Sequence, residues 1–442
     1  MTITAERIAS AIAARMGDAQ QFLADLIATP SLSGQESAAM ELVERAFAKV
    51  SDVRRVPMTN ALRDDKDYSD PIPGIEYDGR WNVRACQTGS GGGRTLLLNT
   101  HIDTVPPAQG QPDPFTPLVR DGVMFGRGAC DAKGQAATIY LAMAALKDLG
   151  IALRGDLVAH LVVEEENGGN GTLAMARALE QADACLVLEP TDMKILPAIR
   201  GAVWFRITLA GKAGHSGQAG ITRSALKMAV RVMEILEGYH ARLLAGSRGG
   251  VSAMFDKFPN PMPLTIGRLH AGNWPASAPA EATLEGVLGL LPNKTAQQVM
   301  AEMTAAIRDE GGPDIAQNFA IHFTYRHDSS VCPADHPLVK ALLSSLGQYG
   351  DSPQKQGTVP VDAPSVVLHG DCPLPLGTVP TLIDAMTASC DAWLYNNHLG
   401  IPTAVFGGGS LSVAHSAREQ MPLGDLQRAA EAVANLAVQW CG

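Results

Sequence analysis

Short apolar runs in the first half of the chain alternate with longer segments of helical periodicity. Apolar runs of about four to eight residues between turn residues are typical of buried strands, whereas apolar positions spaced three or four residues apart are typical of helices. We expect buried strands at residues 95–98, 156–163 and 185–188, and a helix at residues 136–149. Strands that alternate with helices predict an α/β fold with a mostly parallel sheet and helices on both faces.

The pattern changes near residue 197, where alternating apolar and polar positions replace the continuous apolar runs. The expected strands lie at residues 203–209, 264–269, 283–290 and 319–325, and the expected helices lie at residues 224–244 and 295–308. Strands of this kind with two helices predict a small α+β unit that has a single sheet. We therefore expect an inserted domain at residues 198–328.

The α/β pattern returns after the insertion. We expect a helix at residues 337–346, a strand at residues 403–406 and a closing amphipathic helix at residues 423–440. The main domain would then consist of two parts, residues 1–197 and residues 329–442.

The N-terminal segment is expected to be helical. Residues 1–50 have the periodicity of two helices, and Ser33 is placed to cap the second one because Glu36 follows three residues later. Residues 58–80 are polar and contain proline and glycine, so we expect a surface loop there.

The composition is that of a soluble globular protein. The chain has 442 residues, 46% of them hydrophobic and 18% charged, and this length favours two domains over one. The net charge of −10, without a basic cluster, argues against nucleic acid as a partner. Seven scattered cysteines, no signal peptide and no apolar run of the ~18 residues that span a bilayer indicate a cytoplasmic protein without disulfide bonds or membrane contact.

Acidic and histidine side chains follow the expected strands. Since the carboxyl ends of parallel strands meet at one edge of a sheet, where open α/β sheets bind ligands, these side chains should lie together. Five ligand positions result: His101, Asp131, one of the three successive glutamates Glu164, Glu165 and Glu166, Glu189, and His415. Each has a plainer explanation by itself; the glutamates, for example, could form a solvated charge run.

Two histidines and three carboxylates are a suitable ligand set for two divalent ions that share one carboxylate. A spare carboxylate beside such ions can act as a general base on a water molecule. Asp103, two residues after His101, can accept the imidazole N–H and fix the tautomer of the ring.

These motifs, in this order, resemble the metallo-amidohydrolase family of acetylornithine deacetylase, succinyl-diaminopimelate desuccinylase, carboxypeptidase G and the aminoacylases. The resemblance runs from about residue 20 to the end of the chain. It implies a di-zinc, aminopeptidase-like catalytic domain interrupted by a lid and dimerisation domain, and therefore a homodimer. It also implies hydrolysis of an amide bond in a small molecule such as an N-acyl amino acid, with cobalt or manganese as alternatives to zinc.

The resemblance implies individual roles as well. His101, Asp131, Glu166, Glu189 and His415 match the metal ligands. Glu165 matches the general base, with Glu164 as the alternative, and Asp103 matches the aspartate beside the first histidine. His215 in GKAGHSG matches a lid histidine that stabilises the oxyanion in the partner subunit's active site.

The chain departs from this family pattern at several positions. Thr100 precedes the first histidine, Gln135 replaces a glycine, and residues 407–409 are three glycines. The arginine that many members carry after the third lid strand is missing from residues 283–292.

A substrate carboxylate needs a cationic donor, usually a bidentate arginine. We expect Arg326, at the end of the last lid strand, to supply it, with Arg418 in AHSARE as the second candidate. A dipeptidase or carboxypeptidase of the same family would share every residue named so far, and a non-catalytic binding protein on this scaffold is the alternative from another class.

Overall fold

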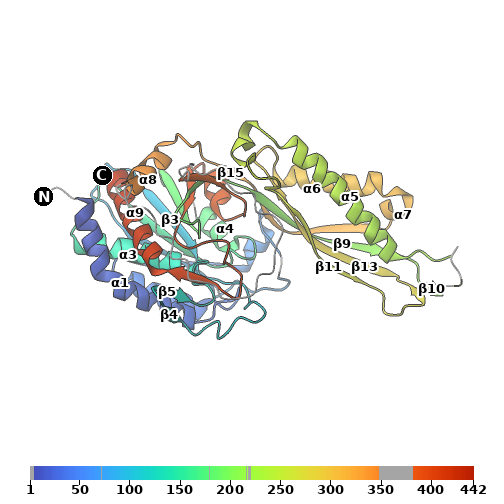
Figure 1. Ribbon diagram of the computed structural model, residues 1–442, viewed down its shortest axis with the longest axis horizontal. Coiled ribbons are helices and arrows are strands. Elements are labelled where there is room, and N and C mark those ends of the chain that lie inside the picture. Colours follow the sequence, from blue (N-terminus) through green and yellow to red (C-terminus); the bar gives the residue numbers. More distant parts are fainter. Residues whose placement is uncertain (1–3, 71, 179, 216, 218–220, 348–381) are drawn as a thin grey trace.

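The computed structural model describes residues 4–70, 72–178, 180–215, 217, 221–347 and 382–442. Figure 1 shows a larger body that contains both ends of the chain and an elongated, smaller body beside it. Strands of the smaller body reach towards the larger one, so the two bodies meet at the ends of a sheet.

A nine-stranded mixed sheet crosses the larger body. Its order is β1-β2-β6-β3-β7-β17-β8-β15, with β16 paired to β8. The central strands β6, β3, β7 and β17 are parallel, whereas β1, β2 and β15 pair antiparallel with their neighbours. The strands are β1 (Asp52–Pro57), β2 (Trp81–Gln87), β3 (Leu96–His101), β6 (Leu157–Val162), β7 (Ala184–Leu188), β8 (Ile195–Ile199), β15 (Ser330–Val331), β16 (Ile383–Met386) and β17 (Thr403–Phe406). The predicted α/β fold with a largely parallel central sheet is confirmed.

Helices cover both faces of this sheet because its central strands are buried on both sides. One face packs against α1 (Ala5–Ala28), α2 (Ser37–Phe47), α3 (Lys133–Asp148), α8 (Pro337–Gly347) and α9 (Leu423–Cys441). The other face packs against residues 390–401, which include a π-helix (Leu394–His398), next to α4 (Asn170–Arg177). α3 is buried from Lys133 to Leu146 because it lies between the sheet, α1 and α9; its many alanines allow this close packing.

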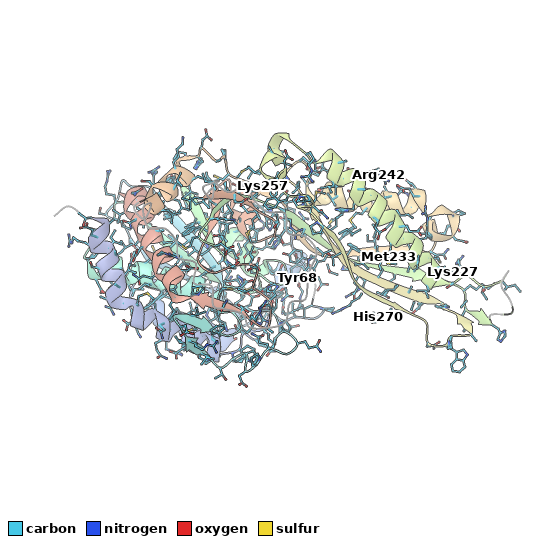
Figure 2. All side chains as sticks on the ribbon, viewed as in Figure 1. Tyr68, Lys227, Met233, Arg242, Lys257 and His270 are labelled. Carbon is cyan, nitrogen blue, oxygen red and sulfur yellow. The ribbon has the colours of Figure 1, made fainter. Side chains whose placement is uncertain are left out.

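The smaller body is a four-stranded antiparallel sheet with helices on one face. The sheet order is β11-β13-β9-β14. Its strands are β9 (Gly201–Ala210), β11 (Leu264–Ala271), β13 (Glu281–Leu290) and β14 (Phe319–His327), and its helices are α5 (Ala225–Gly246), α6 (Ala296–Glu310) and α7 (Gly312–Ala316). The expected elements of this region are present, and Thr295 starts α6 with a capping box. Figure 2 shows Lys227, Met233 and Arg242 on α5 and His270 on the sheet.

Several short elements complete the chain. β10 (Gly214–His215) pairs with β12 (Ser277–Ala278) at the far end of the smaller body (Figure 1). β4 (Leu118–Arg120), β5 (Val123–Phe125) and β18 (Gln420–Pro422) form a three-stranded sheet, and 3-10 helices occur at Asn60–Asp64 and Gly250–Phe255. Within the described ranges, no helix is long and apolar enough to cross a membrane.

The described part of residues 58–80 is a loop with one 3-10 helix, as expected, but some of its residues are buried rather than at the surface. Asp67, Ser69 and Tyr77 are at most 2% exposed. The backbone N–H of Asp70 donates to the carbonyl of Thr324 in β14 at 2.7 Å, and Tyr68 lies where the two bodies meet (Figure 2). Asp67 is buried here because Arg177 of the larger body and Arg326 of the smaller body both pair with it.

The predicted cap of the second helix is also wrong. α2 begins after Glu36, which makes no side-chain cap, and Ser33 instead donates its hydroxyl to Asp103 Oδ2 at 3.2 Å. The carboxylate of Glu36 accepts hydrogen bonds from Arg80 at 2.8 and 2.9 Å. Both side chains therefore form tertiary hydrogen bonds instead of capping α2.

Candidate metal centre

The predicted ligands converge at the carboxyl edge of the parallel strands. His101 is the last residue of β3, Glu189 directly follows β7, and Glu166 follows β6. His415 comes from the segment after β17, and Asp131 lies just before α3. The fold therefore brings together five side chains that are far apart in the sequence.

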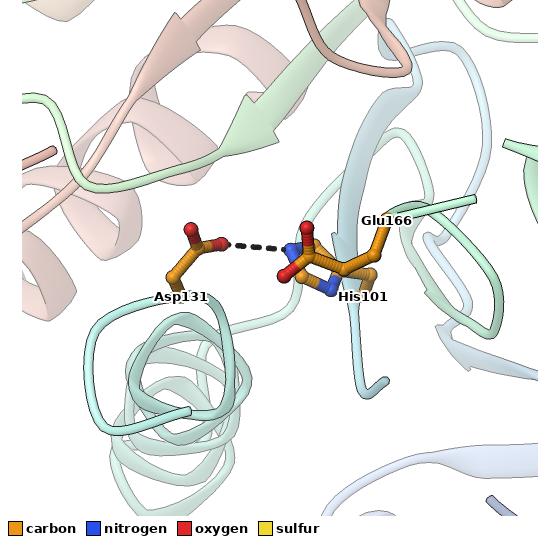
Figure 3. A group of neighbouring side chains, drawn as sticks. All are labelled: His101, Asp131 and Glu166. Atoms are coloured by element: carbon orange, nitrogen blue, oxygen red, sulfur yellow. Dashed lines mark hydrogen bonds and ion pairs between the residues drawn. The ribbon is translucent and has the colours of Figure 1, made fainter. Parts of the chain in front are cut away.

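Asp131 lies between the two histidines. Its Oδ1 is 3.0 Å from His101 Nε2, as Figure 3 shows, and its Oδ2 is 3.3 Å from His415 Nε2. Each histidine has a second carboxylate nearby: Glu189 Oε1 is 3.9 Å from His101 Nε2, and Glu166 Oε1 is 3.1 Å from His415 Nε2. The cluster consists of two half-sites, each with one histidine and one glutamate, that share Asp131.

The electrostatics of the cluster favour positive charge. Burial raises the pKa of Glu166, and it raises that of Glu189 well above its usual value. Burial also acts to raise the pKa of Asp131, but hydrogen bonds with His101 and His415 outweigh it and lower that pKa. Hydrogen bonds with Asp131 and Glu166 raise the pKa of His415 to about 11. Nitrogen and carboxylate donors around such a location fit two divalent ions of the zinc type.

Asp103 holds the backbone next to the cluster through buried hydrogen bonds. It is fully buried, and its Oδ1 and Oδ2 accept the backbone N–H groups of Glu165 and Glu166 at 3.1 and 3.2 Å. The Nδ1 of His101 lies 3.0 Å from the backbone carbonyl of Asp103 and 3.4 Å from its carboxylate. The carbonyl is thus the nearer acceptor for the ring N–H, which leaves Nε2 of His101 available as a ligand.

The three successive glutamates point to different places. Glu164 has φ +61°, and its carboxylate accepts hydrogen bonds from Arg80 at 2.7 Å and from the Tyr77 hydroxyl at 2.8 Å. Glu166 faces the metal-ligand cluster, and Glu165 is buried nearby, where burial raises its pKa well above the usual value. The geometry therefore favours Glu165 over Glu164 as the free carboxylate of this run.

His215 is not part of the cluster within one chain. It lies in β10 at the far end of the smaller body (Figure 1), where it is exposed. Its ring Nδ1 accepts a hydrogen bond from the backbone N–H of Gly217 at 3.1 Å. A role for His215 at a metal centre therefore requires a second subunit.

The two arginines expected to bind substrate differ in their surroundings. Arg326 pairs with Asp67 at 2.9 Å and donates to the carbonyl of Lys66 at 3.0 Å. Arg418 is exposed, whereas the neighbouring Glu419 is buried and pairs with Arg127. The segment around Arg418 consists of turns.

Two buried basic residues beside Asp131, Arg127 and Lys133, were not among the residues predicted from the sequence. Arg127 forms a buried ion pair with Glu419, whose Oε1 accepts the backbone N–H of Asp131 at 3.3 Å. Lys133 donates to the carbonyls of Leu26 and Thr29, and burial lowers its pKa to about 7. Both basic residues flank Asp131 in the segment GRGACDAKG. Two positive charges so close to a predicted metal ligand were the signal in the sequence that could have identified them.

Comparisons with known proteins agree with this architecture. The model of peptidase family M20/M25/M40 matches residues 97–366. An acetylornithine deacetylase from Myxococcus xanthus is 27% identical over 82% of this chain and 84% of its own length. An N-formyl-4-amino-5-aminomethyl-2-methylpyrimidine deformylase from Bacillus subtilis is 25% identical over 78% of this chain and 79% of its own.

Solved structures share the fold. The dipeptidase Dug1p from Saccharomyces cerevisiae superimposes with a TM-score of 0.75 at 14% identity, covering 100% of this chain and 99% of that one. A metallo-carboxypeptidase from Sulfolobus solfataricus gives a TM-score of 0.69 at 16% identity, covering 95% and 98% of the two chains.

Fold, site and relatives together define an enzyme of the metallopeptidase and amidohydrolase class, which acts on amide bonds. The chain belongs to peptidase family M20/M25/M40.

The ion cluster of Arg80 yields a stability prediction. Arg80→Met leaves the carboxylates of Glu36 and Glu164 buried without their cation, which should cost ~3–5 kcal/mol of unfolding free energy. Arg45→Met, which breaks an exposed pair with Glu41, should cost less than ~1 kcal/mol. Urea unfolding followed by circular dichroism measures both.

The Arg80→Met loss should also depend on pH. Burial raises the pKa of Glu36 to about 7, so below that pH the carboxyl is protonated and needs the cation less. The difference between wild type and variant should therefore be larger at pH 8 than at pH 6. Equal losses for the Arg80 and Arg45 variants would contradict this account of the cluster.

Proposed function

We propose that this protein hydrolyses the amide bond of an N-acyl amino acid, using two divalent metal ions. The ions would be held by His101, Asp131, Glu166, Glu189 and His415. The observation that carries the proposal is the position of Asp131, with one carboxylate oxygen towards each histidine. This is the arrangement that a carboxylate shared by two metal ions needs.

Glu165 would act as the general base. The ions, when bound, polarise the scissile carbonyl and make an attacking water more acidic. Glu165 accepts the proton of that water and passes it to the nitrogen of the leaving amine. Its burial supports this role, because a carboxylate in a poorly solvated site binds a proton more tightly than one in water.

His215 would complete the site from the partner subunit of a homodimer. Within its own chain it is exposed, far from the metal-ligand cluster, at the end of the smaller body (Figure 1). A histidine donor at the acyl oxygen can stabilise the negative charge that develops in the tetrahedral transition state. The smaller body would form the dimer contact, and residues 198–328 would then be a lid and dimerisation domain.

A dipeptidase or carboxypeptidase activity would use the same residues. The structural relatives include proteins described as a dipeptidase and a metallo-carboxypeptidase. All three activities need a donor for a substrate carboxylate, for which we propose Arg326, with Arg418 as the second candidate.

The ion pair of Arg326 favours a second candidate function, hydrolysis of an amide that has no carboxylate. Asp67 already neutralises Arg326 at 2.9 Å, so a substrate carboxylate would have to compete with a buried partner. The Bacillus subtilis relative is described as a deformylase of an N-formyl aminomethylpyrimidine, a compound without a carboxylate.

Substitutions in the glutamate run test the base and the ligand separately. Glu165→Gln should lower kcat by ~10²–10⁴-fold and keep both metal ions, because it removes only the proton acceptor. Glu166→Gln should lose metal as well. Turnover and elemental analysis of the purified variants distinguish the two results. A swapped outcome would exchange the roles of the two residues, and full turnover after complete metal removal would exclude the metal mechanism.

Mixing two inactive variants tests the role of His215. Chains with His215→Ala and chains with Glu165→Gln, once subunits have exchanged, should regain activity, because one site of each heterodimer contains both intact residues. Activity after mixing is compared with that of each variant alone, and differently tagged chains verify exchange. Verified exchange without recovery would place His215 outside the partner subunit's chemistry.

A substrate panel tests the acyl group and the carboxylate anchor. For N-acyl amino acids, Arg326→Ala should reduce the preference in kcat/KM for the acid over its carboxamide by ~30-fold or more. Arg418→Ala in the same assay tests the second candidate. Dipeptides and an N-formyl aminomethylpyrimidine complete the panel. No preference for the acid in the wild type would favour the carboxylate-free substrate.

A further inference from the structure

A buried polar cluster lies directly beside Glu165. Ligand-type atoms of Glu165, His327 and Asp391 lie within 4.8 Å of one another, and all three residues are buried. They come from three separate parts of the fold: Glu165 follows β6, His327 ends β14, and Asp391 lies just before the π-helix. The metal ligands do not account for this cluster.

Two atoms of the cluster have no hydrogen-bond partner in the described part of the chain: His327 Nε2 and Asp391 Oδ1. They lie 3.9 Å apart. Both face the backbone of Gly169, since a Cβ there would be 2.3 Å from Asp391 Oδ1 and 3.0 Å from His327 Nε2. Buried polar groups are nearly always paired, and Glu165 has a carboxylate oxygen within 4.8 Å of the ligand-type atoms of both residues.

Neighbouring side chains fix the orientation of both groups. The hydroxyl of Thr172 donates to Asp391 Oδ2 at 2.6 Å, which leaves Oδ1 for other contacts. The Tyr325 hydroxyl lies 2.9 Å from His327 Nδ1 and 3.2 Å from Ser389 Oγ.

The direction of these hydrogen bonds follows from charge. If the Tyr325 hydroxyl donates to Nδ1, the ring of His327 carries its proton on Nε2, facing the carboxylates. When both carboxyls are ionised, as a general base at Glu165 requires, the opposite direction would place a nitrogen lone pair against the oxygens of Asp391 and Glu165, which is repulsive. Burial lowers the pKa of His327 to about 3, although a backbone hydrogen bond with Gly168 acts in the opposite direction, so at neutral pH the ring is neutral and carries a single N–H donor.

We propose that His327 and Asp391 are positioning residues for Glu165, with the Nε2–H of His327 directed at the two carboxylates so that Glu165 keeps one orientation towards the metal centre. The inference rests on the proposed role of Glu165 as the base. His327 ends the strand that returns from the smaller body, so the position of the base depends on how that body is placed.

A pair of substitutions at His327 tests the proposal. His327→Leu removes the N–H at similar volume and should lower kcat by ~10–100-fold, the usual loss when a reacting group is slightly misplaced. His327→Gln places an amide N–H near the position of Nε2 and should restore most of this activity. KM and the number of bound metal ions should not change in either variant.

The same substitution in the Glu165→Gln background separates positioning from a general structural role. Because His327 acts through Glu165, His327→Leu should cost little further activity once Glu165 is replaced, as single-turnover assays with excess enzyme would show. An equal loss in both backgrounds would overturn the proposal, and so would wild-type activity of His327→Leu or a loss of metal. Full turnover of Glu165→Gln alone would contradict the proposed role of Glu165 as the base. If Glu165→Gln is inactive but His327→Leu causes the same further loss with and without it, only the positioning role of His327 is contradicted.

Two further variants control for the possibility that His327→Leu misfolds. His160 is a matched control, because it is also a buried histidine 2.9 Å from a tyrosine hydroxyl, that of Tyr395. His160→Leu should leave the kcat of the folded protein within about threefold of wild type. If His327→Leu does not fold, Tyr325→Phe removes only the hydroxyl that orients His327. Its loss of kcat should be smaller, about 3–10-fold, and should also disappear in the Glu165→Gln background; unchanged kcat would overturn the proposal.

Discussion

Negative charge buried at one edge of the central sheet is the constraint on which the surrounding structure depends. Carboxylates of Asp131 and three glutamates lie there beside two histidines, and buried like charges are unfavourable unless cations or protons balance them. The supporting groups are arranged accordingly. Asp103 accepts two backbone N–H groups, Glu164 pairs with Arg80, and Glu419 pairs with Arg127. The arginines balance the charge of Glu164 and Glu419. The carboxylates of the centre itself have no such arginine partner in the described part of the chain, and this remaining negative charge favours the binding of divalent ions.

The junction between the two bodies depends on a second buried carboxylate. Asp67 contacts Arg326 from the smaller body and Arg177 from α4 of the larger one, at 2.9 and 2.7 Å. One strand, β14, carries both Arg326 and His327, so the residue expected to bind substrate and the residue beside Glu165 move together. A change in the placement of the smaller body would thus reach the substrate and the base at the same time.

The elements that could be predicted from the sequence are those whose burial is nearly complete. β3, β6 and β7 are buried on both faces, so they appear as continuous apolar runs, and α3 appears as an alanine-rich helix. β1 was not predicted, because it is an exposed edge strand with the sequence DVRRVP and has no apolar pattern. The capping motif at Ser33 failed because Asp103, distant in the sequence, accepts its hydroxyl instead. Local patterns predict local structure until a tertiary partner competes for the same group.

The sequence by itself determined the α/β class, and it predicted the inserted α+β unit and the set of acids and histidines at the strand ends, because these follow from periodicity and from short motifs. Only the tertiary structure decided that Glu164 turns to Arg80, that Arg326 is paired with Asp67, and that His327 and Asp391 surround Glu165. The physical reason is distance along the chain. Hydrophobic periodicity acts within one element, whereas the partner of a buried charge is chosen by how elements from distant parts of the sequence pack together.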